Sequence, residues 1–151
     1  MTKKITFILI LLLLNSCGYN SVLKNTSNDF SIASIEIQDK NEVSYKIRNS
    51  LSNYIGLDNK SKNYIVSIKS NVENRITSKD SKGDPKTLEL IITISLSVSE
   101  NQNNFDKQFI KSFAYTTRAN KFELKNYENS IRDNLIDKIS IEISNYIIKI
   151  S

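Results

Sequence analysis

An unbroken series of aliphatic residues at every second position in the middle of the chain is the feature that most constrains its fold. Every second residue from 88 to 98 is aliphatic, in the order Leu88, Leu90, Ile92, Ile94, Leu96 and Val98. Because side chains of a strand point alternately to its two faces, this pattern predicts a long strand with one buried face. Such a face must be covered by another layer of the domain.

Three further segments have the pattern of strands. Apolar residues recur at nearly every second position over residues 64–72, and aromatic residues recur on one face of the segment 109–115. A shorter apolar alternation covers 30–37. The clearest loop, 78–86, contains the Gly-Asp-Pro sequence, and the polar turn 101–104 predicts a hairpin between the long strand and the strand that follows it.

Two segments have the three- or four-residue apolar spacing of amphipathic helices. The first spans Val43 to Ile55; Asp39 and Glu42 before it form the pattern of a capping box, and Gly56 stands where a C-cap glycine is expected. The second begins at about Asn126. Its apolar stripe consists of Tyr127, Ile131, Leu135, Ile139, Ile143, Ile147 and Ile150.

This order of elements, β-α-β-β-β-α, predicts an α+β fold with two helices packed on one face of a mostly antiparallel four-stranded sheet. Residues 30–151 would form this single domain, after a polar, aperiodic tether at 17–29. We expect the helix stripes to form a core with one face of the sheet. The sheet residues of that core would be Val66, Ile68, Leu90, Ile92, Ile94, Leu96 and Phe113.

Composition argues against catalysis. The chain has no histidine, the commonest general base and metal ligand, and its three glycines cannot form a phosphate-binding loop. Its acidic residues are scattered, with no spacing typical of a metal site. A Ser–Lys pair stays open as an alternative, but no spacing marks one out. We therefore expect no catalytic residue, no metal, no cofactor and no enzymatic activity.

The N-terminus has the pattern of a secretion signal. Lys3 and Lys4 precede the apolar run Ile5 to Leu14, which is too short to span a bilayer comfortably, and Cys17, the one cysteine of the chain, follows it closely. This arrangement resembles the lipobox of bacterial lipoproteins. The resemblance implies that residues 1–16 are a signal peptide and that Cys17 is acylated. The alternatives are an ordinary signal peptide, or an anchor helix beside which Cys17 is incidental.

The resemblance to lipoproteins also bears on location and charge. In such proteins an aspartate after the cysteine favours the inner membrane; Gly18 stands there instead, which implies the outer membrane, with the domain facing the periplasm or a barrel lumen. Without residues 1–16 the chain keeps 19 basic and 16 acidic residues, a net charge of +3. That excess is too small to indicate nucleic acid as a partner.

Over most of its length the chain resembles the LPS-assembly lipoprotein E family. The similarity begins at Cys17-Gly18-Tyr19 and includes the helix 43–55 and the strand 88–98. It is densest over 113–128 and continues into the helix 131–147. The family implies a non-enzymatic protein held in the outer membrane by its N-terminal acyl chains. Such a protein plugs the LPS-assembly outer-membrane β-barrel, assists its folding, and binds lipopolysaccharide on its way to the cell surface.

The resemblance directs attention to four basic residues, Arg75, Arg118, Lys121 and Lys125, as candidates for binding lipopolysaccharide. Lipid A presents phosphates, which arginine can match bidentately and lysine can meet as a point charge. If the loops 78–86 and 117–125 lie at the same end of the sheet, Arg75 and Arg118 could converge. The alternative is that these residues are ordinary solubility charges.

Two questions stay open at the level of sequence. The second face of the long strand, with Glu89, Ile91, Thr93, Ser95 and Ser97, is either solvated or packs against a barrel wall. The chain could also be an outer-membrane lipoprotein that acts as an auxiliary or adaptor component of another envelope lipid-transport system.

Overall fold

The computed structural model describes residues 29–151; the predicted signal peptide, Cys17 and nearly all of the predicted tether lie outside this range. The predicted α+β class and the order β-α-β-β-β-α are confirmed. The elements are β1 (Phe30–Ile37), α2 (Glu42–Ser50), the 3₁₀ turn η2 (Ser52–Tyr54), β2 (Lys62–Lys79), β3 (Pro85–Glu100), β4 (Asn103–Thr116) and α3 (Lys121–Ile150).

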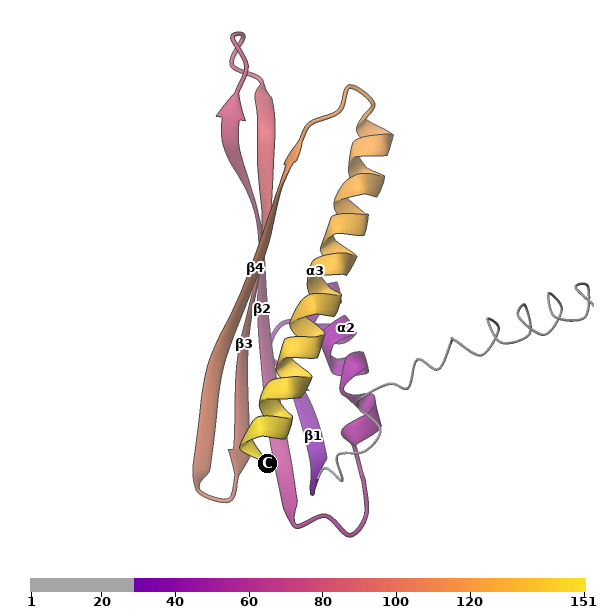
Figure 1. The fold of residues 1–151 in the computed structure, drawn as a ribbon, viewed down its shortest axis with the longest axis vertical. Coiled ribbons are helices and arrows are strands. Elements are labelled where there is room, and N and C mark those ends of the chain that lie inside the picture. The colour runs from indigo at the N-terminus through magenta and orange to yellow at the C-terminus, as the bar shows by residue number, and fades with distance from the viewer. Residues whose placement is uncertain (1–28) are drawn as a thin grey trace, which may run out of the picture.

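The four strands form one sheet in the order β1-β2-β3-β4. β1 runs parallel to β2, and the other neighbours are antiparallel. Both helices lie on one face of this sheet, as Figure 1 shows. At about 3.4 Å per residue, the 18 residues of β2 extend for roughly 60 Å, so the domain is long and narrow. Within residues 29–151, neither helix is both long and apolar enough to cross a bilayer.

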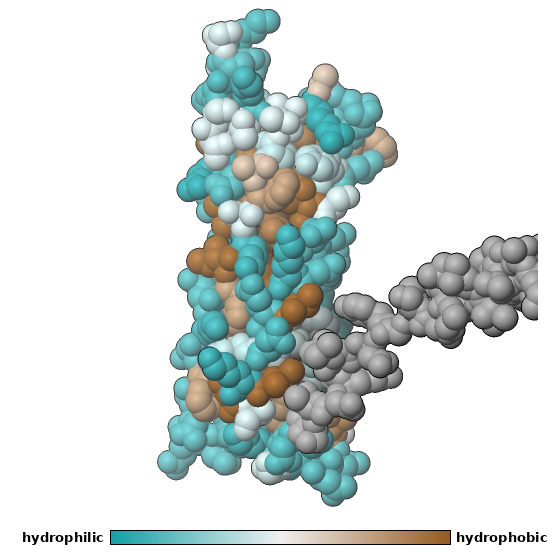
Figure 2. Space-filling view, in the orientation of Figure 1, coloured by the Kyte–Doolittle hydropathy of each residue, from teal (hydrophilic) through white to brown (hydrophobic). Residues whose placement is uncertain are grey.

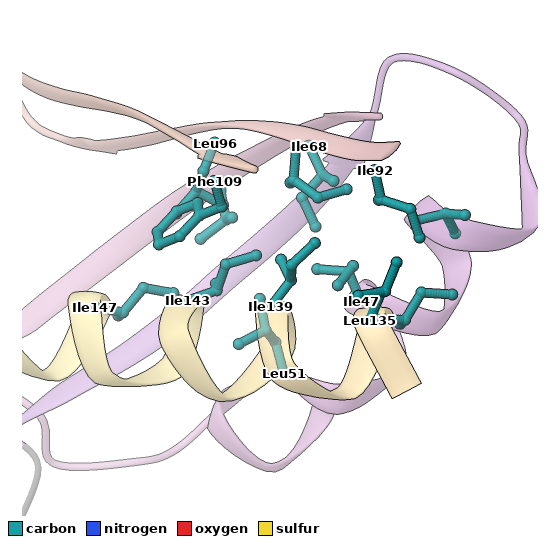
Figure 3. Close-up of a cluster of buried hydrophobic side chains, with 14 of the residues drawn as sticks. Ile47, Leu51, Ile68, Ile92, Leu96, Phe109, Leu135, Ile139, Ile143 and Ile147 are labelled. Atoms are coloured by element: carbon teal, nitrogen blue, oxygen red, sulfur yellow. The ribbon is translucent and has the colours of Figure 1, made fainter. Parts of the chain in front are cut away.

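The core fills the space between the helices and the sheet. Ile143 and Ile147 project from α3 toward Leu96 and Phe109, and Ile139 belongs to the same layer (Figure 3). Ile47 of α2 and Leu51, the residue that directly follows α2, complete this core. All but one of the sheet residues predicted for the core are buried: Val66, Ile68, Leu90, Ile92, Ile94 and Leu96. This burial of aliphatic side chains is the main force that holds α3 against the sheet.

Phe113 is the exception, because its side chain is 45% exposed. Its partner in the β3–β4 register is the buried Leu90, so Phe113 lies on the core face as predicted. β4 is an edge strand, however, and no described strand lies beyond it to cover the outer side of the ring. The prediction that Phe113 belongs to the buried core was therefore wrong, whereas Phe109 and Tyr115 on the same strand are buried.

The start of α2 differs from the predicted capping box. Asn41 is the N-cap: its side-chain oxygen accepts a hydrogen bond from the backbone N–H of Ser44 at 3.0 Å. Asp39 has another role, since its carboxylate accepts hydrogen bonds from the Ser44 hydroxyl and from the backbone N–H of Ser70. Asp39 thus joins the first turn of α2 to β2, which a pattern along the chain could not show.

The end of α2 also differs from the prediction. The helix stops at Ser50 and a 3₁₀ turn follows, so Gly56 is not its C-cap. Gly56 instead has a φ of +66° and donates a hydrogen bond from its N–H to the carbonyl of Ile32 at 3.1 Å. The positive φ explains why glycine is suited to this position, where the chain returns to β1.

The second helix starts earlier than its apolar stripe indicates. α3 begins at Lys121 because the Asn120 side chain accepts hydrogen bonds from the N–H groups of Phe122 and Glu123. Its first turn is exposed, and burial begins further along, so the hydrophobic spacing could not mark the start. At the other end, Lys62 donates to the carbonyl of Ile150, which places a cation at the helix C-terminus.

β2 is longer than predicted and projects beyond the rest of the sheet. β1 pairs only with residues 62–68 of β2, whereas β3 pairs with β2 as far as Lys79. The distal part of the β2–β3 hairpin therefore stands clear of β1 and α2 (Figure 1). Ile76, which lies on the helix side of this part, is 47% exposed.

We expect Asp39→Ala to destabilise the domain by about 1–3 kcal/mol, the usual cost of leaving a buried donor without its acceptor. Ser44 and Ser70, the residues that donate to Asp39, are 0% and 8% exposed. Urea unfolding followed by circular dichroism measures the change. Asp137→Ala, at an exposed position of α3, is the control. Equal midpoints for the two variants would contradict a stabilising role for Asp39.

Candidate functional site

The basic candidates gather at one end of the domain. β2 ends and β3 begins at the same end of the sheet at which β4 ends, so the loops 80–84 and 117–120 lie at that end (Figure 1). The two loops thus lie at the same end of the sheet, which is the condition under which Arg75 and Arg118 could converge. We call residues 75–89 and 118–125 the basic end.

The basic end carries the whole charge excess of residues 17–151. It contains Arg75, Lys79, Lys82, Lys86, Arg118, Lys121 and Lys125, against Asp80, Asp84, Glu89 and Glu123. Its net charge of +3 equals that of residues 17–151, so the rest of this stretch is neutral on balance. Figure 2 shows hydrophilic side chains covering the projecting tip of the hairpin. A local positive field at this end would favour anionic ligands.

Arg75 is engaged within the sheet. Its guanidinium lies 2.5 Å from a carboxylate oxygen of Glu89, its partner in the β2–β3 register. The hydroxyl of Ser112 on β4 donates to the second oxygen of Glu89 at 2.7 Å. These two contacts, that of Ser112 being the larger, hold the pKa of Glu89 below its usual value. Glu89 is therefore ionised at neutral pH and partly satisfies the charge of Arg75.

Arg118 is held differently. Its guanidinium lies over the ring of Tyr127 on α3, with the central carbon 4.4 Å from the ring centroid. Tyr127 in turn meets Tyr115 edge to face, with centroids 6.1 Å apart, and the Tyr115 hydroxyl donates to Glu128 at 2.7 Å. Arg118 is exposed, so the ring orients its guanidinium while leaving it in contact with solvent.

The two arginines do not converge on one face. Arg75 shares its row of the sheet with Glu89 and Ala114, on the side away from the helices. Arg118 stacks on α3, on the helix side. Lys121 and Lys125 lie in the exposed first turns of α3, close in sequence to Arg118. The candidates therefore form a helix-side group of three residues, with Arg75 separate from it.

The sheet face turned away from the helices is bare within residues 29–151. We call this the open face; Ser67, Lys69, Ser95, Ser97, Asp106 and Gln108 lie on it, around a hollow of about 330 Å³. Ile65 and Ile110 on this face are 45% and 57% exposed. The open face is thus polar and rich in hydroxyl groups, with isolated aliphatic side chains.

Two contacts of the candidate residues escaped the sequence analysis. The pairing of Arg75 with Glu89 depends on the β2–β3 register, which the chain alone does not specify. The stacking of Arg118 on Tyr127 depends on where α3 begins. In residues 29–151 no group of three or more His, Cys, Asp or Glu side chains is placed to hold a metal ion.

Comparison with solved structures identifies the fold class as one found in bacterial lipoproteins. The chain is similar to rare lipoprotein B from Shewanella oneidensis, with 14% identity and a TM-score of 0.61, over 80% of this chain and 98% of that one. It is also similar to a minor lipoprotein from Acinetobacter baumannii, with 15% identity and a TM-score of 0.57, over 79% and 91% of the two chains.

A third solved structure, uncharacterized lipoprotein B from Nitrosomonas europaea, has 12% identity and a TM-score of 0.57, over 77% of this chain and 83% of that one. The sequence matches no protein-family model, and no curated protein matches it at a significant level. At identities this low, the structural likeness establishes a shared fold.

Proposed function

We propose that this chain is an outer-membrane lipoprotein that plugs the LPS-assembly β-barrel, assists its folding and binds lipopolysaccharide during transport to the cell surface. The observation that carries the proposal is the fold of residues 29–151, which is shared with solved lipoproteins over 83–98% of their lengths. The signal-like N-terminus with Cys17 at its end agrees with the same class of protein.

The arrangement of the domain supports this role. β1 begins with Phe30 at the end of the sheet opposite the basic end, because β1 is parallel to β2. An anchor at Cys17 would thus join the domain at one end, and the basic end would project by the length of the sheet. A narrow, elongated domain of this kind suits the lumen of a barrel, and its basic end suits the phosphates of lipid A.

Co-purification tests the barrel partner. We expect the chain, isolated from outer membranes in mild detergent, to carry a large β-barrel protein in stoichiometric amount. An inner-membrane or periplasmic partner in place of the barrel would instead favour the alternative, an adaptor of another envelope lipid-transport system.

Binding to purified lipopolysaccharide tests the ligand. We expect Arg118→Asp to weaken binding by about tenfold, because it replaces a charge-assisted contact to phosphate with repulsion. Lys40→Asp is the control, since Lys40 is exposed but lies in the link between β1 and α2, away from the basic end. Because Arg75 already pairs with Glu89 on the other face, we expect Arg75→Gln to leave the affinity unchanged.

Lipopolysaccharide without its phosphates separates charge recognition from other effects. The wild-type chain and Arg118→Asp should bind it equally, and circular dichroism of the two should coincide. If Arg118→Asp and Lys40→Asp bind intact lipopolysaccharide as the wild type does, Arg118 is an ordinary solubility charge.

A further inference from the structure

β4 offers a long backbone edge that no described strand covers. It has 14 residues, Asn103–Thr116, and stands last in the sheet order, paired on one side with β3. Among residues 29–151, no strand pairs with its outer side. The outward N–H and C=O groups of an edge strand are a template to which another extended segment can add.

Two separate hollows lie between this strand and α3. Near the C-terminus of α3, a hollow of about 350 Å³ is bounded by Lys107 and Ile110 of β4 and by Tyr146 and Lys149 of α3. Further along α3, a second hollow of about 250 Å³ lies between Phe113 and the helix. Its remaining lining residues are Tyr127, Ser130, Ile131, Asn134, Leu135 and Lys138. We call the two hollows together the β4–α3 groove.

The groove is basic. Lys107, Lys138 and Lys149 line it, and within residues 29–151 no carboxylate lies within 4.0 Å of their amino groups. The one acidic residue that lines it, Glu142, is 2.5 Å from the amino group of Lys111 and is therefore already neutralised. The groove thus presents three positive charges without a partner among the described residues.

Lys107 is the best placed of these cations to select what adds to β4. Its amino group lies 5.1 Å from the ring centroid of Phe109 and 4.5 Å from that of Tyr146, so both rings hold it at the mouth of the groove. A charge on an edge strand discourages pairing with a neutral or basic strand. The same charge favours a strand whose opposite residue is a carboxylate.

We propose that β4 and the β4–α3 groove bind an extended acidic segment of a partner protein, which adds to the sheet as a fifth strand. Carboxylates of that segment face Lys107 and the lysines of α3. Apolar residues on the other side of that segment cover Ile110 on the open face, which is 57% exposed. Backbone hydrogen bonds supply affinity, and the lysines supply the choice of partner.

A second copy of this chain suits the edge less well. Two β4 strands side by side would each bring the unpaired charge of Lys107 to the same seam, and like charges across a strand pair are destabilising. The site is also independent of the proposed function, which rests on the anchor, the basic end and a barrel partner. Either proposal can fail without the other.

Short synthetic peptides test the inference on the full mature chain. The first alternates Glu and Val, so that a strand of it has one acidic and one apolar face, and the second alternates Lys and Val. We expect the Glu–Val peptide to bind in a fluorescence titration and the Lys–Val peptide not to bind. Hydrogen exchange should show newly slowed backbone amides within residues 103–116.

Charge reversal at Lys107 then tests whether this residue selects an acidic partner segment. We expect Lys107→Glu to weaken binding of the Glu–Val peptide by about tenfold, the effect of losing one close charge pair. Lys82→Glu makes the same charge change at the hairpin tip and should leave binding unchanged. If Lys107→Glu lowers the melting temperature, Lys107→Gln replaces it, with a smaller loss in the same direction expected.

Four results would overturn the proposal. The first two are equal binding of the two peptides, and equal effects of Lys107→Glu and Lys82→Glu on binding. The third is binding without slowed amides in residues 103–116, which would mean that the peptide only adsorbs to lysines. The fourth is that the amides in that range are already protected in a self-associated chain, which would make the occupant a second copy.

Discussion

Replacing Ile139 by aspartate should unfold the domain. Ile139 is 0% exposed and projects from the middle of α3 toward the sheet, among aliphatic side chains (Figure 3). An unpaired carboxylate at that position has no donor nearby to replace the water that it loses. The cost is several kcal/mol, a large part of the 5–15 kcal/mol by which domains are usually stable.

The same helix supplies a matched control. Ile141 lies two residues further along α3 and is 59% exposed, so Ile141→Asp makes the same chemical change in contact with water. We expect Ile141→Asp to melt close to the wild type, and Ile139→Asp to lack a cooperative transition in circular dichroism. Similar melting temperatures for the two variants would contradict the packing of α3 described here.

The parts of the fold that could be predicted are those fixed by hydrophobic periodicity. The alternation over 88–98 predicted β3, and the stripe that includes Ile139 predicted the buried face of α3; both are confirmed. Hydrophobic periodicity shows which side chains of a helix or strand point toward the core. It does not show whether neighbouring elements cover those side chains along the whole length, which is why Phe113 on the edge strand was assigned wrongly to the buried core.

Element ends were predicted less well, because they depend on polar contacts. Asp39 and Asn41 are both plausible caps by residue type, and only the approach of Ser70 on β2 assigns Asp39 to the tertiary contact. The start of α3 is set by Asn120 in a stretch with no buried residue.

The candidate site shows the same division. Residue type and the family resemblance together singled out the basic residues near the two loops, and the topology shows that those loops share one end of the sheet, which the sequence had left open. Sequence could not show that Glu89 engages Arg75 or that Tyr127 supports Arg118, since both contacts join elements that are distant along the chain. The role of these residues in binding lipopolysaccharide stays a prediction.

The second large effect is expected at Cys17, which lies outside the residues that the structure describes. Each buried CH₂ of an acyl chain contributes about 0.8 kcal/mol, so several chains hold a protein to a membrane almost permanently. Cys17→Ser would remove the attachment point that the lipobox resemblance implies for these chains. We therefore expect the variant either to remain an uncleaved precursor or to leave the outer-membrane fraction.

Gly18→Asp is the matched variant for location. It keeps Cys17, the predicted site of acylation, but introduces the residue that favours inner-membrane retention in similar lipoproteins, so it should be processed normally and move to the inner membrane. Fractionation on a density gradient, with mass spectrometry of the N-terminal peptide, distinguishes the three chains. If Cys17→Ser is still cleaved and reaches the outer membrane in normal amount, the acyl anchor is not what holds the protein there. A contact of the folded domain, such as the proposed barrel, would then supply the attachment.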